Sequence, residues 1–279
     1  MTWLKIAILL FALGLSVTSV ASALGLAGGA IISPTLILVL GLEPRVAIGT
    51  TIMGVFTAVL SASLAYLKQK RVDVRLALLF DALDVVGVAL GAYLTVVLPP
   101  ELLIAFLGAF LLYTGGRLAY KVLSGQHEAK TGEKSVRDRM IWKRTIIDAE
   151  GRAYSYGLGL SGLAAAIGGS FFSGLVSGML GLGGGVMDLS IMLLLGVPVE
   201  IAVPTVMFGM LLTRVSSVVA HALLGNIRLD TAIPLALGAL VGGQLGPRIF
   251  KKARPGVLKL AFSCIVMVLG VMLLLRCIK

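Results

Sequence analysis

The chain has 279 residues, of which 58% are apolar and only 13% are charged, and its mean hydropathy is +1.03. Soluble domains carry roughly 25% charged residues, so this composition excludes an ordinary soluble protein and indicates a polytopic membrane protein. The net charge of +11 does not indicate a nucleic-acid partner, because the Lys and Arg residues lie between apolar runs, as in the positive-inside pattern.

Ten apolar segments predict an all-α protein of 8 to 10 transmembrane or re-entrant helices in a lipid bilayer. They lie near residues 3–24, 30–42, 46–67, 76–98 and 102–122, then 157–180, 186–197, 201–224, 231–250 and 256–275. Between the two sets, residues 123–153 carry seven Lys or Arg and five Asp or Glu. We expect a first transmembrane repeat (1–122), a cytoplasmic linker (123–153) and a second transmembrane repeat (154–279).

The first segment has two interpretations. Lys5, the apolar stretch and the sequence Val20-Ala-Ser-Ala are features of a cleavable signal peptide. The stretch is also long enough to span a bilayer, and it leads directly into a glycine cluster that recurs in the second half. We therefore expect it to be the first transmembrane helix.

Glycine clusters follow the first segment of each half, as Gly25-Leu-Ala-Gly-Gly and Gly181-Leu-Gly-Gly-Gly. Such a cluster breaks a membrane helix and exposes backbone N–H groups that can hold an anion. The next apolar segment is about 13 residues, or roughly 20 Å of helix, against a hydrocarbon core of roughly 30 Å. We expect both breaks to lie at depth in the bilayer and to face the inside of the molecule.

The two halves match over about 100 residues, which predicts an internal duplication of the kind common in secondary transporters. A shift of 155 pairs Gly41 with Gly196, Thr50 with Thr205, Gly54 with Gly209 and Gly87 with Gly242, and a shift of 156 pairs the glycine clusters.

The repeats can be inverted or parallel, depending on whether the short second segments cross the membrane. With Arg214 left out, the inverted arrangement places 18 Lys and Arg inside and 5 outside, and the parallel arrangement 17 and 6. The inverted arrangement also keeps Arg248, Lys251, Lys252 and Arg254 inside, so the positive-inside rule favours it.

Arg214 lies near the middle of its apolar segment, where a guanidinium normally faces a partner or an aqueous cavity. It is the best single candidate for an anion contact, although a structural pair with a carboxylate would also explain it. Asp81 and Asp84 lie one helical turn apart and share a face. They are candidates for proton or sodium coupling, for a salt bridge to Arg214, or for a place near the membrane interface.

Asp188 follows the second glycine cluster, where the first half has Ile32 or Ser33. It is a candidate for cation coupling or for pairing with Arg214. His221 pairs with Tyr66 in the repeat, and we expect it to be a packed residue rather than a proton relay.

Hydroxyl side chains begin the third segment of each half, as Thr50 and Thr51 and as Thr205. They can cap the helix start or share its N–H groups with an anion. The chain has no Gly-x-Ser-x-Gly elbow, no His-Glu-x-x-His and no Walker sequence, so we expect neither an enzyme nor a cofactor or metal.

Several of these motifs resemble the sulfite exporter TauE/SafE family of membrane transporters. The resemblance rests on Gly25-Leu-Ala-Gly-Gly with Pro34, Ala47-Ile-Gly-Thr-Thr, Arg71-Val-Asp, Gly181-Leu-Gly-Gly-Gly, Ala202-Val-Pro-Thr and Gly225-Asn-Ile. It implies transport of sulfur-containing anions such as sulfite, sulfoacetate or related organosulfonates. It also implies an anion site framed by Gly28, Gly29, Thr50, Thr51, Gly184, Gly185 and Thr205. The second half departs from the pattern, since it has Asp188, no counterpart of Pro34, and Pro204 where Gly49 stands.

We therefore expect a multi-pass secondary transporter of small anions in the cell inner membrane, with a proton or sodium ion coupled through Asp81, Asp84 or Asp188. One repeat would move against the other, and a homodimer is left open. An anion channel would use the same glycine backbone as a filter. A membrane scaffold would use small-residue faces such as Gly87-x-x-x-Gly91 only to pack helices.

Overall fold

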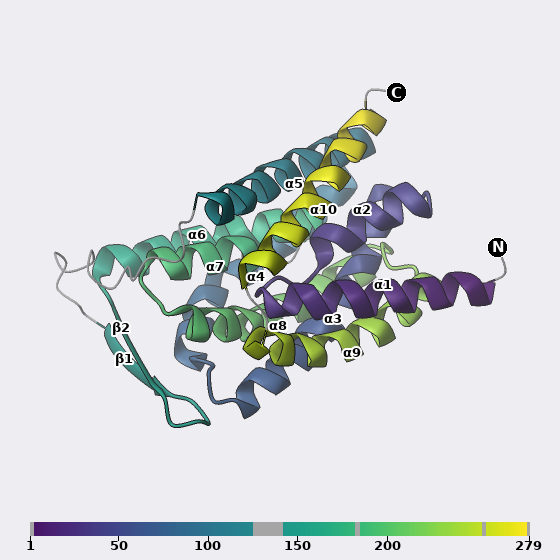
Figure 1. Ribbon diagram of the computed structural model, residues 1–279. Helices are drawn as coiled ribbons and strands as arrows, with labels where there is room; N and C mark the ends of the chain where they lie inside the picture. The colour runs from purple at the N-terminus through teal and green to yellow at the C-terminus, as the bar shows by residue number, and fades with distance from the viewer. Residues whose placement is uncertain (1–2, 125–141, 182–184, 253–254, 278–279) are drawn as a thin grey trace.

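The computed structural model describes residues 3–124, 142–181, 185–252 and 255–277. Over these residues the chain forms ten helices and one two-stranded hairpin (Figure 1), which confirms the predicted all-α polytopic membrane protein. The helices are α1 (Trp3–Ala23), α2 (Gly29–Val39), α3 (Pro44–Lys68), α4 (Val74–Val97), α5 (Pro100–Leu123), α6 (Leu160–Leu180), α7 (Gly185–Leu194), α8 (Val199–Leu223), α9 (Leu229–Lys252) and α10 (Pro255–Cys277).

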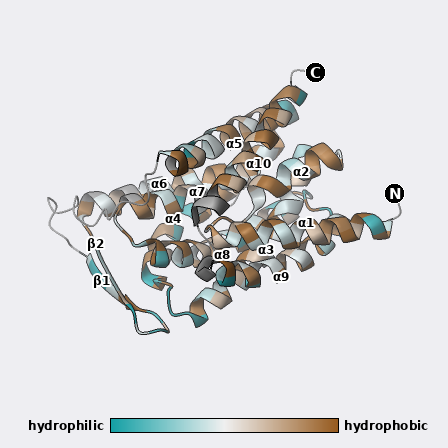
Figure 2. Ribbon diagram, viewed as in Figure 1, coloured by the Kyte–Doolittle hydropathy of each residue, from teal (hydrophilic) through white to brown (hydrophobic). Residues whose placement is uncertain are grey.

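Seven helices of the described part are long and apolar enough to cross a membrane. Hydrophobic residues run along most of the helices, while hydrophilic residues gather near helix ends and in the hairpin (Figure 2). α2 and α7 are the short helices that the glycine clusters predict, with 11 and 10 residues. Eleven residues give roughly 16 Å of helix, about half of the hydrocarbon thickness.

Glycine makes both breaks possible. Gly28, the residue before α2, has φ of 86°, and Gly181, the residue after α6, has φ of 69°. These left-handed conformations are strained for residues with a Cβ atom. The chain therefore turns sharply from α1 into α2 and leaves α6 sharply before α7.

The halves contain five equivalent helices each, and their packing is exchanged between halves. α1 packs along α9, the counterpart of α4, and α6 packs along α4. In the same way α3 packs against α9 and α8 packs against α4, while α5 and α10 pair with each other. The two repeats are therefore interleaved, and neither forms a separate body.

Equivalent helices run in opposite directions, so the repeats are inverted. The start of α3 at Gly49 lies against Asn226, just beyond the end of α8. Near the other end, the Ser63 hydroxyl donates to the carbonyl oxygen of Met207 in the first half of α8 (2.8 Å). Figure 1 shows the consequence: both chain termini lie at one end of the molecule and the hairpin lies at the other.

Glycines allow the closest helix contacts. Gly87 and Gly91 of α4 lie directly on the α6 backbone at Phe171 and Leu175. At the equivalent contact, Gly242 of α9 lies on the α1 backbone at Leu15. The small-residue faces seen in the sequence are therefore packing faces in both halves.

A hairpin that was not predicted from the sequence lies within the linker and the start of the second repeat. Its strands β1 (Trp142–Ile147) and β2 (Ala153–Leu158) pair antiparallel. It docks on the connection between α3 and α4. Asp73 accepts hydrogen bonds from Arg144 (2.8 and 3.0 Å) and from the Tyr156 hydroxyl (2.7 Å). Arg71 pairs with Asp148 (3.0 Å).

These contacts hold both carboxylates ionised. Burial opposes ionisation of Asp73, but hydrogen bonds from Arg144, Tyr156 and a backbone N–H lower its pKa below the ordinary value. Burial likewise opposes ionisation of Asp148, yet hydrogen bonds from backbone N–H groups and from Arg71 lower its pKa to about 2. The hairpin is thus fastened to the helices by charged groups on the side that carries the linker.

Candidate functional site

The two glycine breaks meet in the interior. A Cβ atom added at Gly185 would lie 2.5 Å from the carbonyl oxygen of Gly25, so the start of α7 contacts the end of α1 directly. Gly25 rests against Leu189 and Val203, and Gly181 rests against Ser33 and Ile48. Leu189 is the repeat equivalent of Ser33, and Val203 of Ile48. Each break therefore packs against residues of the opposite repeat.

Of the glycines expected to frame an anion site, Gly28, Gly29 and Gly185 are buried near these breaks, while Gly184 lies outside the described residues. Among the residues that the structure describes, no side chain caps the N-terminus of α2 at Gly28. An uncapped, buried helix start presents N–H groups and the positive end of the helix dipole. This arrangement is suited to an anion.

Four charged residues lie together beside the second break, and we call them the charged cluster. They are Asp81 and Asp84 of α4, Asp188 of α7 and Arg214 of α8. All four are buried, and Arg214 is 0% exposed. The guanidinium interacts electrostatically with all three carboxyl groups. Arg214 Nη2 donates to the Ser177 hydroxyl of α6, whereas Nε and Nη1 have no hydrogen-bond partner in the described residues.

The carboxyl groups are also incompletely bonded. Asp188 accepts from Ser173 of α6, but its Oδ1 has no partner in the described part of the chain. In the described residues neither carboxyl oxygen of Asp84 has a hydrogen-bond partner, and the Thr213 hydroxyl donates to the Met210 carbonyl oxygen (3.0 Å). Asp81 and Asp84 thus face the protein interior rather than the membrane surface.

The net charge of the cluster gives its chemical tendency. Three ionised carboxylates and one guanidinium sum to −2, and buried net charge is costly. The cluster therefore favours the binding of cations or protons. In the part of the chain that the structure describes, no group of three His, Cys, Asp or Glu residues is placed to hold a metal ion.

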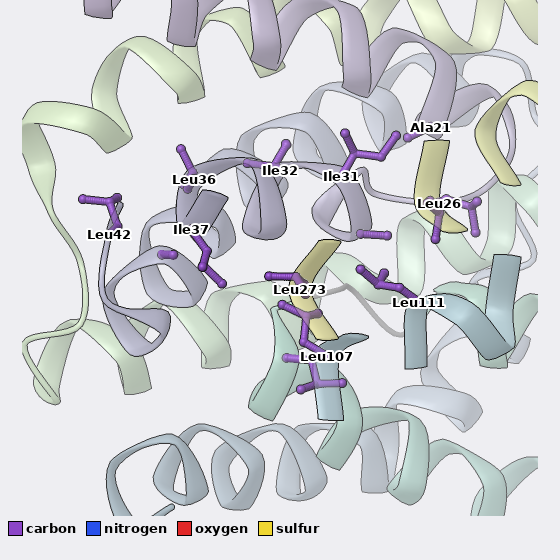
Figure 3. Packing of buried hydrophobic residues seen from close by; sticks show 14 of the residues in the cluster. Ala21, Leu26, Ile31, Ile32, Leu36, Ile37, Leu42, Leu107, Leu111 and Leu273 are labelled. Atoms are coloured by element: carbon purple, nitrogen blue, oxygen red, sulfur yellow. The ribbon is translucent and has the colours of Figure 1, made fainter. Parts of the chain in front are cut away.

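The internal repeat provides a control for this cluster. The equivalents of Asp81, Asp84, Ser173, Ser177, Asp188 and Arg214 in the other half are Ala236, Ala239, Val17, Ala21, Ile32 and Val59. All six are apolar, and Figure 3 shows Ala21 and Ile32 within a hydrophobic cluster. The same helix arrangement is built there without any charge. The fold therefore does not require the charged cluster.

Thr50 and Thr205 make equivalent bonds across the repeats. The backbone N–H of Asp73 donates to Thr205 Oγ1 (3.0 Å), and that of Arg228 donates to Thr50 Oγ1 (3.1 Å). Each threonine holds the start of the fourth helix of the other half. Thr51 is fully buried, and its hydroxyl has no partner among the described residues.

His221 also has a structural counterpart. Its Nε2 bonds to the carbonyl oxygen of Gly178 (3.1 Å), and the Tyr66 hydroxyl donates to the carbonyl oxygen of Ser22 (3.2 Å), which is the equivalent contact. When Nε2 carries the proton, Nδ1 can accept from Asn226 (3.2 Å). Both side chains therefore fasten the third helix of their half to the first.

Two serines that were not predicted from the sequence as site residues contact the charged cluster. Ser173 and Ser177 lie four residues apart on α6 and share a face with Gly181. Their regular spacing was visible in the sequence, but nothing there showed that α6 faces α4, α7 and α8.

Comparison with known proteins gives two matches. The model of the family described as sulfite exporter TauE/SafE matches residues 10–273. A probable membrane transporter protein, YunE of Bacillus subtilis (strain 168), is 30% identical over 276 residues, covering 96% of this chain and 97% of that protein. No solved structure matches the chain.

Proposed function

The chain belongs to the sulfite exporter TauE/SafE family, and we propose that it is a proton-coupled secondary transporter of small sulfur-containing anions rather than an enzyme. The substrate class is sulfite, sulfoacetate or related organosulfonates. The observation that carries the proposal is the charged cluster, which is buried, incompletely bonded and replaced by apolar residues at the equivalent place in the other half.

Coupling follows from electrostatics. While Asp81, Asp84 and Asp188 are ionised, they oppose the approach of an anion to Nε and Nη1 of Arg214, which have no hydrogen-bond partner in the described residues. Protonation of the carboxylates removes that repulsion. Binding of protons and binding of the anion are therefore mutually favourable, and this linkage is reciprocal. Protons and anion move in the same direction, and the sum of their gradients sets that direction.

Protons are preferred over sodium as the coupling ion because Arg214 already supplies a cation within the cluster, and no three carboxylates of the described chain converge on one metal position. The anion is placed between the guanidinium and the uncapped N-terminus of α2, with Gly28, Gly29, Thr51 and Gly185 nearby.

Because the two halves are interleaved, we no longer expect one whole repeat to move against the other during transport. α4 packs with α6 and α8, and α9 packs with α1 and α3. The units that move during alternating access are these two mixed bundles, which meet where α3 packs on α8. A whole repeat does not move against the other.

Flux into sealed liposomes tests the proposal. Sulfoacetate is the cleaner probe, because acidified sulfite forms a neutral species that crosses bilayers unaided. We expect saturable uptake that accelerates when the lumen is made alkaline and that does not respond to a sodium gradient. Absence of any anion movement would overturn the transporter. Flux that neither saturates nor responds to either gradient would instead indicate a channel.

A further inference from the structure

Two buried hydroxyl groups, those of Ser33 in α2 and Thr51 in α3, differ from most hydroxyls of the helices. Among the described residues, Ser217 of α8 shares their lack of a hydrogen-bond partner. Ser and Thr side chains in helices usually donate to a carbonyl oxygen one turn earlier, as Thr18, Ser19 and Thr35 do here (2.7, 2.6 and 2.6 Å). Ser33 and Thr51 are 0% exposed and have no hydrogen-bond partner in the described chain. A buried hydroxyl without a hydrogen-bond partner destabilises the folded protein, because it has lost its hydrogen bonds to water.

Ser33 lies at the second break, and helix geometry places Thr51 on the helix surface next to it. A Cβ atom added at Gly181 would be 3.2 Å from Ser33 Oγ and 3.2 Å from the carbonyl oxygen of Ile48. Thr51 lies three residues after Ile48 and so occupies a neighbouring position on the same helix surface. Ser33 lies four residues after Gly29, and its side chain leans toward the uncapped start of α2.

The repeat again provides the comparison. The equivalents of Ser33 and Thr51 are Leu189 and Val206, and Gly25 rests on Leu189 as Gly181 rests on Ser33. An apolar side chain therefore packs against the glycine of the break equally well. The hydroxyls are not needed for packing.

One face of α6 joins these hydroxyls to the charged cluster. Ser173, Ser177 and Gly181 follow one another at intervals of four residues. Ser173 binds Asp188, Ser177 binds Arg214, and Gly181 contacts Ser33. A continuous polar path thus leads from the carboxylates to the unpartnered hydroxyls.

We propose that Ser33 and Thr51, with the N–H groups at the start of α2, form the neutral part of the substrate site. This inference rests on the proposed function and names the residues that recognise the substrate. The ligand is an oxyanion whose several oxygens accept hydrogen bonds from the two hydroxyls while its charge faces Arg214. A sulfonate or sulfite group, with three oxygens, fits this description.

The test is the kinetics of sulfoacetate flux in Ser33→Ala, Thr51→Val and Thr51→Ser. Thr35→Val is the matched control, because the Thr35 hydroxyl lies on α2 but already bonds to Ile31. Loss of a hydrogen bond to a charged ligand should raise KM about tenfold in Ser33→Ala and in Thr51→Val. Thr51→Ser keeps a hydroxyl and should remain within twofold of the unmodified protein, as should the control.

Three results would overturn the inference: an unchanged KM in both hydroxyl deletions, an equal rise in Thr35→Val, or no rescue by Thr51→Ser. Thermal unfolding of each purified variant shows whether the fold is intact. If the unmodified protein moves no anion, the proposed function fails. If it moves anion and the deletions leave KM unchanged, only this inference fails.

Discussion

Arg214 is fully buried in the protein interior, and within the described part of the chain its one hydrogen-bond partner is the Ser177 hydroxyl. Burial of a guanidinium costs several kcal/mol unless nearby charges compensate it. Three carboxyl groups supply that compensation here, although each of them is incompletely bonded. Val59 fills the equivalent position in the other half, so the fold can form with an apolar side chain at this point.

Arg214→Gln separates the two interpretations of this residue. We expect the variant to fold and to lose at least 100-fold in anion flux, because the substrate loses its charged contact. Size-exclusion chromatography and liposome flux would check both parts. An Arg214→Gln variant that folds and transports normally would contradict the anion contact.

Neighbouring threonines should respond in opposite ways. Thr50→Val and Thr205→Val each remove the acceptor of a backbone N–H, so each should lower the free energy of unfolding by about 1 kcal/mol with little effect on KM. Thr51→Val should change KM with little loss of stability. Thermal unfolding in detergent and flux kinetics on the same preparations compare them, and a KM effect at Thr50 equal to that at Thr51 would contradict the assignment.

The charged residues of the candidate site could be predicted from the sequence. Asp81, Asp84, Asp188 and Arg214 stand out because charge is rare in apolar segments, and the structure brings all four together. Ser33, Ser173 and Ser177 did not stand out, since serines are common in membrane helices and only their neighbours make them notable.

Helix contacts in this protein depend on glycine at a few positions. Gly91→Ala places a methyl group against the backbone of Leu175 in α6, which cannot move aside without shifting the helix. Overpacking of this kind costs about 1–3 kcal/mol or more, so the midpoint of thermal unfolding should fall by several degrees. Gly116→Ala in α5 is the control, because nothing lies within 4 Å of its added Cβ. Equal midpoints for the two variants would contradict the close α4–α6 contact.

The docked hairpin should be insensitive to pH in the neutral range. Asp73 and Asp148 have pKa values lowered from the ordinary 3.8, Asp148 to about 2. Their contribution to docking is therefore complete above about pH 4 and is lost as the pH falls from there through 2. Trp142 fluorescence reports the hairpin once Trp3 is replaced by Phe. A transition between pH 5 and 8 would contradict these contacts, whereas Asp73→Asn should weaken docking at pH 7.

Elements with strong local patterns were predictable and the hairpin was not. The short α2 and α7 follow from glycine clusters and length arithmetic alone. β1 alternates half-buried and exposed residues, but it does so inside a linker dominated by charge, where exposure was the simpler interpretation. Its docking depends on Asp73 and Arg71, which lie about 70 residues earlier in the chain.

The whole molecule combines an inverted symmetric fold with an asymmetric distribution of polar groups. Most equivalent helix pairs pack together in both halves, yet apolar residues stand at the positions equivalent to the charged cluster and to Ser33 and Thr51. The duplication and the preference for inverted repeats could be predicted from spacing and from the Lys and Arg count. The exchange of α4 and α9 between halves could not, because spacing along a chain does not determine which helices become neighbours.

Anion-dependent proton movement in liposomes carrying a pH-sensitive dye in the lumen tests the central claim most directly. Sulfoacetate added outside should acidify the lumen of vesicles with the unmodified protein, since protons enter with the anion. Asp84→Asn with Asp188→Asn should abolish this acidification, whereas Asp230→Asn, at an exposed surface pair, should leave it intact. Anion uptake without any lumenal pH change, or full acidification in the double variant, would contradict proton coupling through the charged cluster.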